Sequence, residues 1–112
     1  MKKKILVFIT ILFIAIKSFS QVPPEGINYQ AIARDNTGNP LIGASLTVRF
    51  SVHDVIASGA VVYQETNVVT TNIYGLFTTV IGNGTPILGT FPTINWALNN
   101  KFLEVEIDDG SG

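Results

Sequence analysis

A strict alternation of apolar and polar residues over positions 46–53 restricts the fold of this chain more than any other feature. The apolar set is Leu46, Val48, Phe50 and Val52. The polar set is Thr47, Arg49, Ser51 and His53. Neighbouring side chains of a β-strand point to opposite faces, so this pattern predicts a strand with one buried face and one solvated face. Residues 103–108 repeat the pattern, and they predict a second strand of the same kind.

Three further strands are predicted between these two. Residues 27–34 place alternate apolar side chains on one side and end at 35–40, a run of residues that favour turns. Residues 61–71 are rich in β-branched residues, and a break in their alternation at 65–68 predicts a bulge. A hairpin turn is expected at 72–75, where Gly75 can adopt a positive φ, and a returning strand is expected at 76–81.

Residues 85–100 form the least regular stretch, because Pro86, Gly89 and Pro92 interrupt any ladder of hydrogen bonds. We expect this stretch to cross from one sheet to the other and to contain a short helical turn at 94–98. Large aromatic side chains are mostly buried in proteins, so Trp96 is expected to close one end of the core.

No segment after Gln21 has apolar residues at helical spacing over three turns. The sequence therefore predicts an all-β domain, a small antiparallel β-sandwich of the immunoglobulin-like or transthyretin-like kind. The chain has no cysteine, so packed apolar area must stabilise the fold without disulfides.

The first twenty residues have the layout of a helical secretory signal peptide. Three lysines precede an apolar run from Ile5 to Ile16, and small residues follow at Ser18 and Ser20. Cleavage is predicted between Ser20 and Gln21. A retained membrane anchor is the alternative, but the apolar run is shorter than the roughly 20 residues that span a bilayer. The absence of cysteine excludes a lipoprotein signal.

The predicted organisation is thus a signal peptide at 1–20 and one β-sandwich domain at 21–112. Four of the seven basic residues lie in the signal peptide, which leaves three basic and eight acidic residues in the domain, a net charge of −5. Nucleic-acid binding depends on clustered Lys and Arg, so a nucleic-acid partner is disfavoured.

Two sets of motifs resemble known families. Residues 38–44 and 70–77 are similar to the turn motifs of carboxypeptidase-regulatory-like and transthyretin-like sandwiches. A longer series comprises residues 26–31, 33–35, 48–54, 62–66, 74–77, 80–86, 89–91, 94–96 and 102–108. This series resembles the N-terminal domain of secreted and surface proteins from Bacteroidetes-type bacteria.

This second resemblance implies a non-enzymatic structural or interaction module of an exported surface protein, of the adhesin-like or tail-fibre-like kind. The implied location is the cell surface, the outer envelope or the medium, with no membrane contact after signal removal. Its implied partners are downstream domains of a longer parent protein. The resemblance also implies one more strand beyond residues 109–112. The chain is therefore expected to be a fragment lacking its last strand, or to carry an open sheet edge that allows self-association.

The sequence offers little site chemistry, and we expect no enzymatic activity, catalytic residue, metal or cofactor. His53 and Asp54 are adjacent, so in a strand their side chains point to opposite faces and do not form a catalytic pair. Calcium is an alternative at 35–39 and at 108–109, where oxygen ligands gather, but Asx turns and a solvated chain end explain these residues without an ion.

A small glycan- or ligand-binding sandwich is the alternative function. In that case exposed aromatic rings would stack on sugar faces, and the candidates are Tyr63, Tyr74 and Trp96. Such a site requires these rings to lie together on one face, and nothing in the sequence gathers them there.

Overall fold

The computed structural model describes residues 25–111. The predicted signal peptide at 1–20 and its cleavage site between Ser20 and Gln21 lie outside the described residues. Within them the chain forms six strands and one short 3-10 helix. In chain order these are β1 (Ile27–Ile32), β2 (Ser45–Asp54), β3 (Val61–Thr70), β4 (Leu76–Ile81), β5 (Thr85–Leu88), η1 (Phe91–Thr93) and β6 (Lys101–Asp108).

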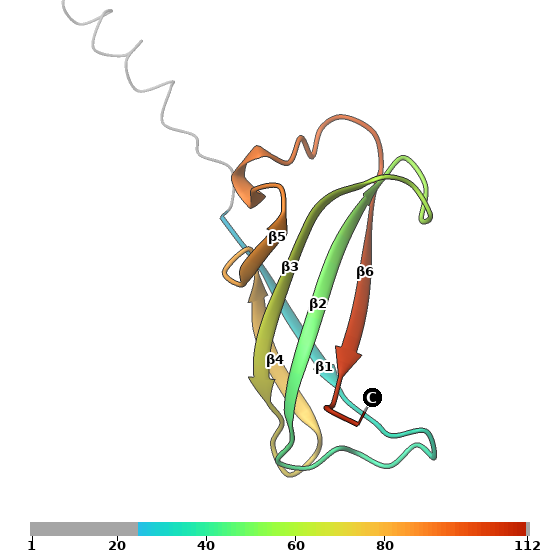
Figure 1. Ribbon diagram of the computed structural model, residues 1–112, viewed down its shortest axis with the longest axis vertical. Helices are drawn as coiled ribbons and strands as arrows, with labels where there is room; N and C mark the ends of the chain where they lie inside the picture. Colours follow the sequence, from blue (N-terminus) through green and yellow to red (C-terminus); the bar gives the residue numbers. More distant parts are fainter. Residues whose placement is uncertain (1–24, 112) are drawn as a thin grey trace, which may run out of the picture.

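The strands form two antiparallel sheets that pack face to face, as Figure 1 shows. One sheet has four strands in the order β5-β3-β2-β6, and the other pairs β1 with β4. The prediction of an all-β antiparallel sandwich is therefore confirmed.

Strand β2 forms the centre of the core. Its predicted inward residues are at most 2% exposed, and Tyr29 of β1 packs edge-on against Phe50 with ring centroids 5.0 Å apart. Ser51, predicted to be solvated, is also buried, and its hydroxyl accepts a hydrogen bond from Gln64 Nε2 at 2.8 Å. The core consists of Ala33, Leu46, Val48, Phe50, Val52, Tyr63, Val69, Phe77, Ile81, Phe91 and Ile94.

The predicted bulge at 65–68 is not found within those residues of β3; the nearest irregularity is a shift between Gln64 and Glu65 in the pairing with β5, where Ile87 is the extra residue. Strand β3 stays paired with β2 through these residues, and its shift against β2 occurs at Val62, because Val52 pairs with Tyr63 while His53 pairs with Val61. The alternation seemed broken because Glu65 lies on the buried face opposite Phe50 while Val68 is 75% exposed.

The predicted turn at 72–75 is present, but the prediction that it joins two paired strands as a hairpin is wrong. Gly75 has a φ of +78°, and its N–H donates to the carbonyl of Asn72. The returning strand β4 has the predicted bounds, yet it pairs with β1 in the other sheet and not with β3. The turn therefore carries the chain from one layer of the sandwich to the other.

Residues 85–100 also differ from the prediction. Residues 85–88 form β5, an edge strand that tolerates Pro86 because proline only needs to avoid a central ladder. The rest runs from β5 to β6, which are opposite edges of one sheet, so it does not cross between sheets. The helical turn lies at Phe91–Thr93, and Phe91 closes the core end with 4% exposure. Trp96 packs edge-on against Phe91 but remains 40% exposed.

Strand β6 has the predicted alternation, but its inward face is only partly covered. Val105 packs against the core, whereas Leu103 is 46% and Ile107 is 45% exposed. These residues share a face with Val52, Phe50 and Val48, the residues of β2 with which they pair. An uncovered apolar face at the edge of the sandwich is the result.

Candidate interaction surface

His53, the only histidine of the sequence, connects β2 to β6 and to the loop between β2 and β3. Its Nδ1 lies 2.8 Å from the carbonyl oxygen of Gly59, and its Nε2 lies 2.9 Å from Glu104 Oε1 on β6. Both partners accept hydrogen bonds, so the doubly protonated imidazolium satisfies both, and these bonds raise the pKa of His53, that to Gly59 most. The neighbouring Asp54 binds Lys101 Nζ at 2.9 Å, so the structure pairs His53 with Glu104 and not with Asp54.

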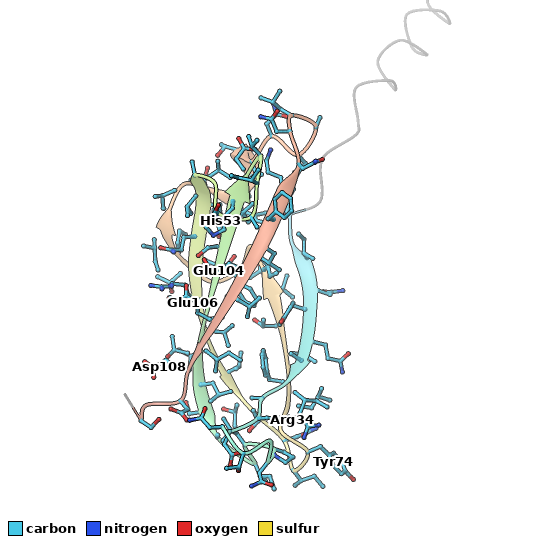
Figure 2. The ribbon with its side chains drawn as sticks, turned by 90° about the vertical axis from the view of Figure 1, so that its right-hand side faces the viewer. Arg34, His53, Tyr74, Glu104, Glu106 and Asp108 are labelled. Atoms are coloured by element: carbon cyan, nitrogen blue, oxygen red, sulfur yellow. The ribbon has the colours of Figure 1, made fainter. Side chains whose placement is uncertain are left out.

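The acidic residues of β6 are arranged on one side of the strand. Figure 2 shows Glu104, Glu106 and Asp108 along the side of β6 that is turned away from β1. Glu106 forms a two-point ion pair with Arg49, with Nε 3.0 Å from Oε1. On the outer face of this sheet, Arg49 and His53 of β2 are thus each paired with a glutamate of β6.

The two stretches considered for calcium border one depression with Ala33 and Ile107. Asp35 Oδ1 accepts the N–H groups of Thr37 and Asn39, each at 2.9 Å, in the expected Asx turn. These bonds lower the pKa of Asp35, with the bond from Asn39 contributing most. Across residues 25–111, no three His, Asp or Glu side chains gather as metal ligands would.

The aromatic candidates for a glycan site are dispersed. Tyr63 is fully buried beside Phe91, with ring centroids 5.5 Å apart. Tyr74 is 67% exposed in the turn that precedes β4, and Figure 2 shows it at the opposite end of the domain from His53. Trp96 follows η1, against Phe91, and so these three rings do not form one surface.

The structure reveals a polar cluster that sequence reasoning missed. Glu65 is fully buried, and its carboxylate accepts bonds from Tyr63 Oη at 2.9 Å, Asn67 Nδ2 at 2.6 Å, Gly84 N at 2.8 Å and Gly82 N. The only signal in the sequence was an acidic residue at a position where β-branched neighbours suggested the core. The cluster is structural, because all four donors belong to the fold.

The remaining surface of interest lies between β1 and β6. We call it the open flank, and it consists of the inward side chains Ile27, Tyr29 and Ala31 of β1 and Leu103, Val105 and Ile107 of β6. Strand β4 packs against β3, and Tyr29 of β1 packs against Phe50 of β2, whereas Leu103 and Ile107 of β6 remain 46% and 45% exposed. Figure 2 looks onto this side, with β6 in front and β1 beside it.

The edge of β1 that borders the open flank also carries unpaired main-chain groups. Ala33 N donates to Gly75 O at 2.9 Å on the side of β4. Along a strand of an antiparallel pair, every second residue directs its N–H and C=O groups to the partner strand, and the residues between them direct these groups away. Asn28, Gln30 and Ile32 therefore direct their N–H and C=O groups away from β4, to the free edge. Apolar side chains thus lie next to main-chain groups that have no partner strand within residues 25–111.

A family model described as a domain of unknown function (DUF8740) matches residues 28–112. The chain belongs to the DUF8740 family. The match extends from the second residue of β1 past the end of β6, so the DUF8740 domain includes both sheets and all of the open flank except Ile27. Searches of curated proteins and of solved structures returned no match. No helix within residues 25–111 has the length and apolar character needed to cross a membrane.

Proposed function

We propose that this DUF8740 domain is a non-enzymatic structural and interaction module of an exported surface protein, of the adhesin-like or tail-fibre-like kind. The open flank is the observation that carries the proposal. It combines apolar side chains with a free strand edge, which are the properties of a surface that pairs with other polypeptide and not of one that turns over a small molecule.

The structural bonds of the buried and half-buried polar side chains support the same proposal. Glu65, His53 and Asp54 are all engaged in bonds that join strands or turns of the domain. The signal-like order of lysines, apolar residues and small residues at 1–20 supports export to the cell surface, the outer envelope or the medium. The resemblance to N-terminal domains of Bacteroidetes-type surface proteins supports a position ahead of other domains.

Mass and N-terminal sequence of the native product test this proposal. The product is recovered from cell envelope and culture supernatant with an antibody against residues 21–112. We expect a species that starts at Gln21 and is much larger than this domain. A cytosolic product that retains Met1 would contradict export, and a product that ends at Gly112 would contradict a module within a longer protein.

A further inference from the structure

The turn between β4 and β5 contains the one Asn-Gly step of the sequence, Asn83-Gly84. Asn83 is exposed to solvent, and its N–H donates to Val80 O at 3.3 Å across the turn. Asparagine followed by glycine is especially prone to spontaneous deamidation, because glycine has no Cβ to hinder attack by its own nitrogen. Every other asparagine of the chain precedes a residue that has a Cβ, so Asn83 is the most reactive asparagine by sequence.

The fold itself requires glycine at position 84. A Cβ added there would lie 2.6 Å from the carbonyl oxygen of Thr66 and 2.7 Å from Asn67 Nδ2, both on β3. Contacts this short would force the turn away from β3. The packing that positions the turn therefore also keeps the residue that makes Asn83 reactive.

The reaction needs only the chain and water. Gly84 N loses its proton and attacks Asn83 Cγ, so that a C–N bond forms and the side-chain nitrogen leaves with that proton as ammonia. The product is a five-membered succinimide ring. Water then opens the ring at either of its two carbonyl carbons, which gives aspartate or isoaspartate at position 83. Nothing is oxidised or reduced.

Glu65 holds the attacking nitrogen in the folded domain. Its Oε2 accepts the N–H of Gly84 at 2.8 Å, and its Oε1 accepts the N–H of Gly82. Attack on Asn83 requires Gly84 N to break this bond, lose its proton and turn toward Cγ. A charge-assisted hydrogen bond opposes the first step, and the negative charge of the fully buried carboxylate opposes a second negative charge beside it.

We propose that Asn83 is a deamidation site that Glu65 protects, so that it is converted only when the turn between β4 and β5 opens. Local opening of the turn and global unfolding both free the nitrogen of Gly84. Since ammonia leaves, the conversion is not reversed when the turn closes. The fraction of aspartate and isoaspartate at position 83 therefore records how often the turn has opened. This inference does not depend on export or on any partner of the domain.

The conversion should also change the structure. Isoaspartate adds one carbon to the main chain between residues 82 and 84, whose N–H groups now fit the two oxygens of one carboxylate. Both products add a negative charge near the buried carboxylate of Glu65. The next element, β5, is exposed at all four residues and has little apolar contact of its own. We therefore expect the modified turn to release β5 from the edge of β3.

The test follows residue 83 by peptide mass spectrometry, with isoaspartate and aspartate separated by chromatography. The product of the full 112-residue sequence, with folding verified by circular dichroism, is incubated in mildly alkaline buffer with and without guanidinium chloride. Amide hydrogen exchange at Gly84 measures opening of the turn in the same protein. Glu65→Gln removes the buried charge and leaves one acceptor oxygen for two glycine N–H groups. Gly43→Ala, which alters a turn elsewhere, is the control for general destabilisation.

We expect conversion to be at least about tenfold slower in the folded protein than in denaturant, with slow amide exchange at Gly84. After correction for the unfolded fraction, Glu65→Gln should convert at least about tenfold faster than Gly43→Ala. Equal rates with and without denaturant, fast exchange at Gly84, or equal rates in the two variants would overturn the inference. Slower conversion in Glu65→Gln would also overturn it, because the carboxylate would then assist the attack as a base.

Discussion

At the scale of single residues, Glu65 shows how one buried carboxylate organises two segments. Two of its donors belong to β3, and the other two are main-chain N–H groups of the turn between β4 and β5. The turn approaches so closely that a Cβ added at Gly84 would lie 2.2 Å from Glu65 Oε2. The carboxylate therefore fixes where the chain re-enters the four-stranded sheet.

Replacing Glu65 with Gln tests this role. The amide NH2 group of Gln would face N–H donors where a carboxylate oxygen accepts them, which leaves buried donors unsatisfied. We expect Glu65→Gln to lower the free energy of unfolding by about 1–3 kcal/mol, measured by urea denaturation. Glu106→Gln, which alters an exposed ion pair, is the control and should cost less. Equal losses in the two variants would contradict the structural role of Glu65.

His53 gives the domain a pH dependence of defined sign. Its pKa is raised in the folded state, so the bonds to Gly59 and Glu104 stabilise the fold fully below the unfolded pKa of about 6.5 and are lost as pH rises through the folded value. We expect the urea midpoint to fall as the pH rises above the unfolded pKa of about 6.5, and His53→Gln to remove most of that fall. Identical pH profiles for both proteins would exclude His53 as the cause.

The inward residues of β2 could be predicted from the sequence because alternation directly reports the two faces of a strand. The role of Glu65 could not, because its main-chain donors at Gly82 and Gly84 lie far along the chain and only the fold brings them together. The pairing of His53 with Glu104 was missed for the same reason, since it depends on the register between β2 and β6.

At the scale of elements, the chain changes layers at the turn before β4. Gly75 has a positive φ, and a Cβ there would lie 2.8 Å from the carbonyl oxygen of Ala33 and 2.9 Å from Pro40 Cβ. This close approach allows β4 to start beside the end of β1. The alternation of β4 revealed its faces but not its partner, so the sequence suggested the simplest hairpin with β3.

The variant Gly75→Ala measures how much the close approach of Gly75 to Ala33 and Pro40 contributes to stability. Gly43 provides a matched control, because its φ is also positive but an added Cβ would meet no atom within 4 Å. We expect Gly43→Ala to cost about 1–2 kcal/mol through backbone strain alone, and Gly75→Ala to cost clearly more. The measurement is urea denaturation of both variants. Similar losses would show that the contacts with Ala33 and Pro40 do not constrain the turn.

At the scale of the whole molecule, the fold depends on one core shared by both sheets. Phe50 is fully buried and contacts Tyr29 of the opposite sheet. We expect Phe50→Ala to lower the free energy of unfolding by about 3–5 kcal/mol, measured by thermal and urea denaturation. Phe102→Ala removes a ring that is 39% exposed and should cost less. Equal costs would contradict a single central core at β2.

The sandwich class could be predicted from the sequence because several alternating segments and the lack of helical periodicity leave few other folds. The position of the two-stranded sheet over the four-stranded sheet could not be predicted. It depends on which strands pair, and the same alternation in β6 suits a covered strand and an uncovered one equally well. Leu103 and Ile107 show this directly, because they alternate as core residues do while remaining nearly half exposed.

The pairing of β1 with β4 joins segments that are far apart in the sequence, so we expect it to form late in folding. Strands β2 and β3 are neighbours in the sequence and can pair early, but β1 must wait until β4 has been synthesised, with most of the domain between them. Both edges of β1 are therefore unpaired in a nascent chain that has not yet reached residue 76. During this interval β1 is a segment that a chaperone could hold.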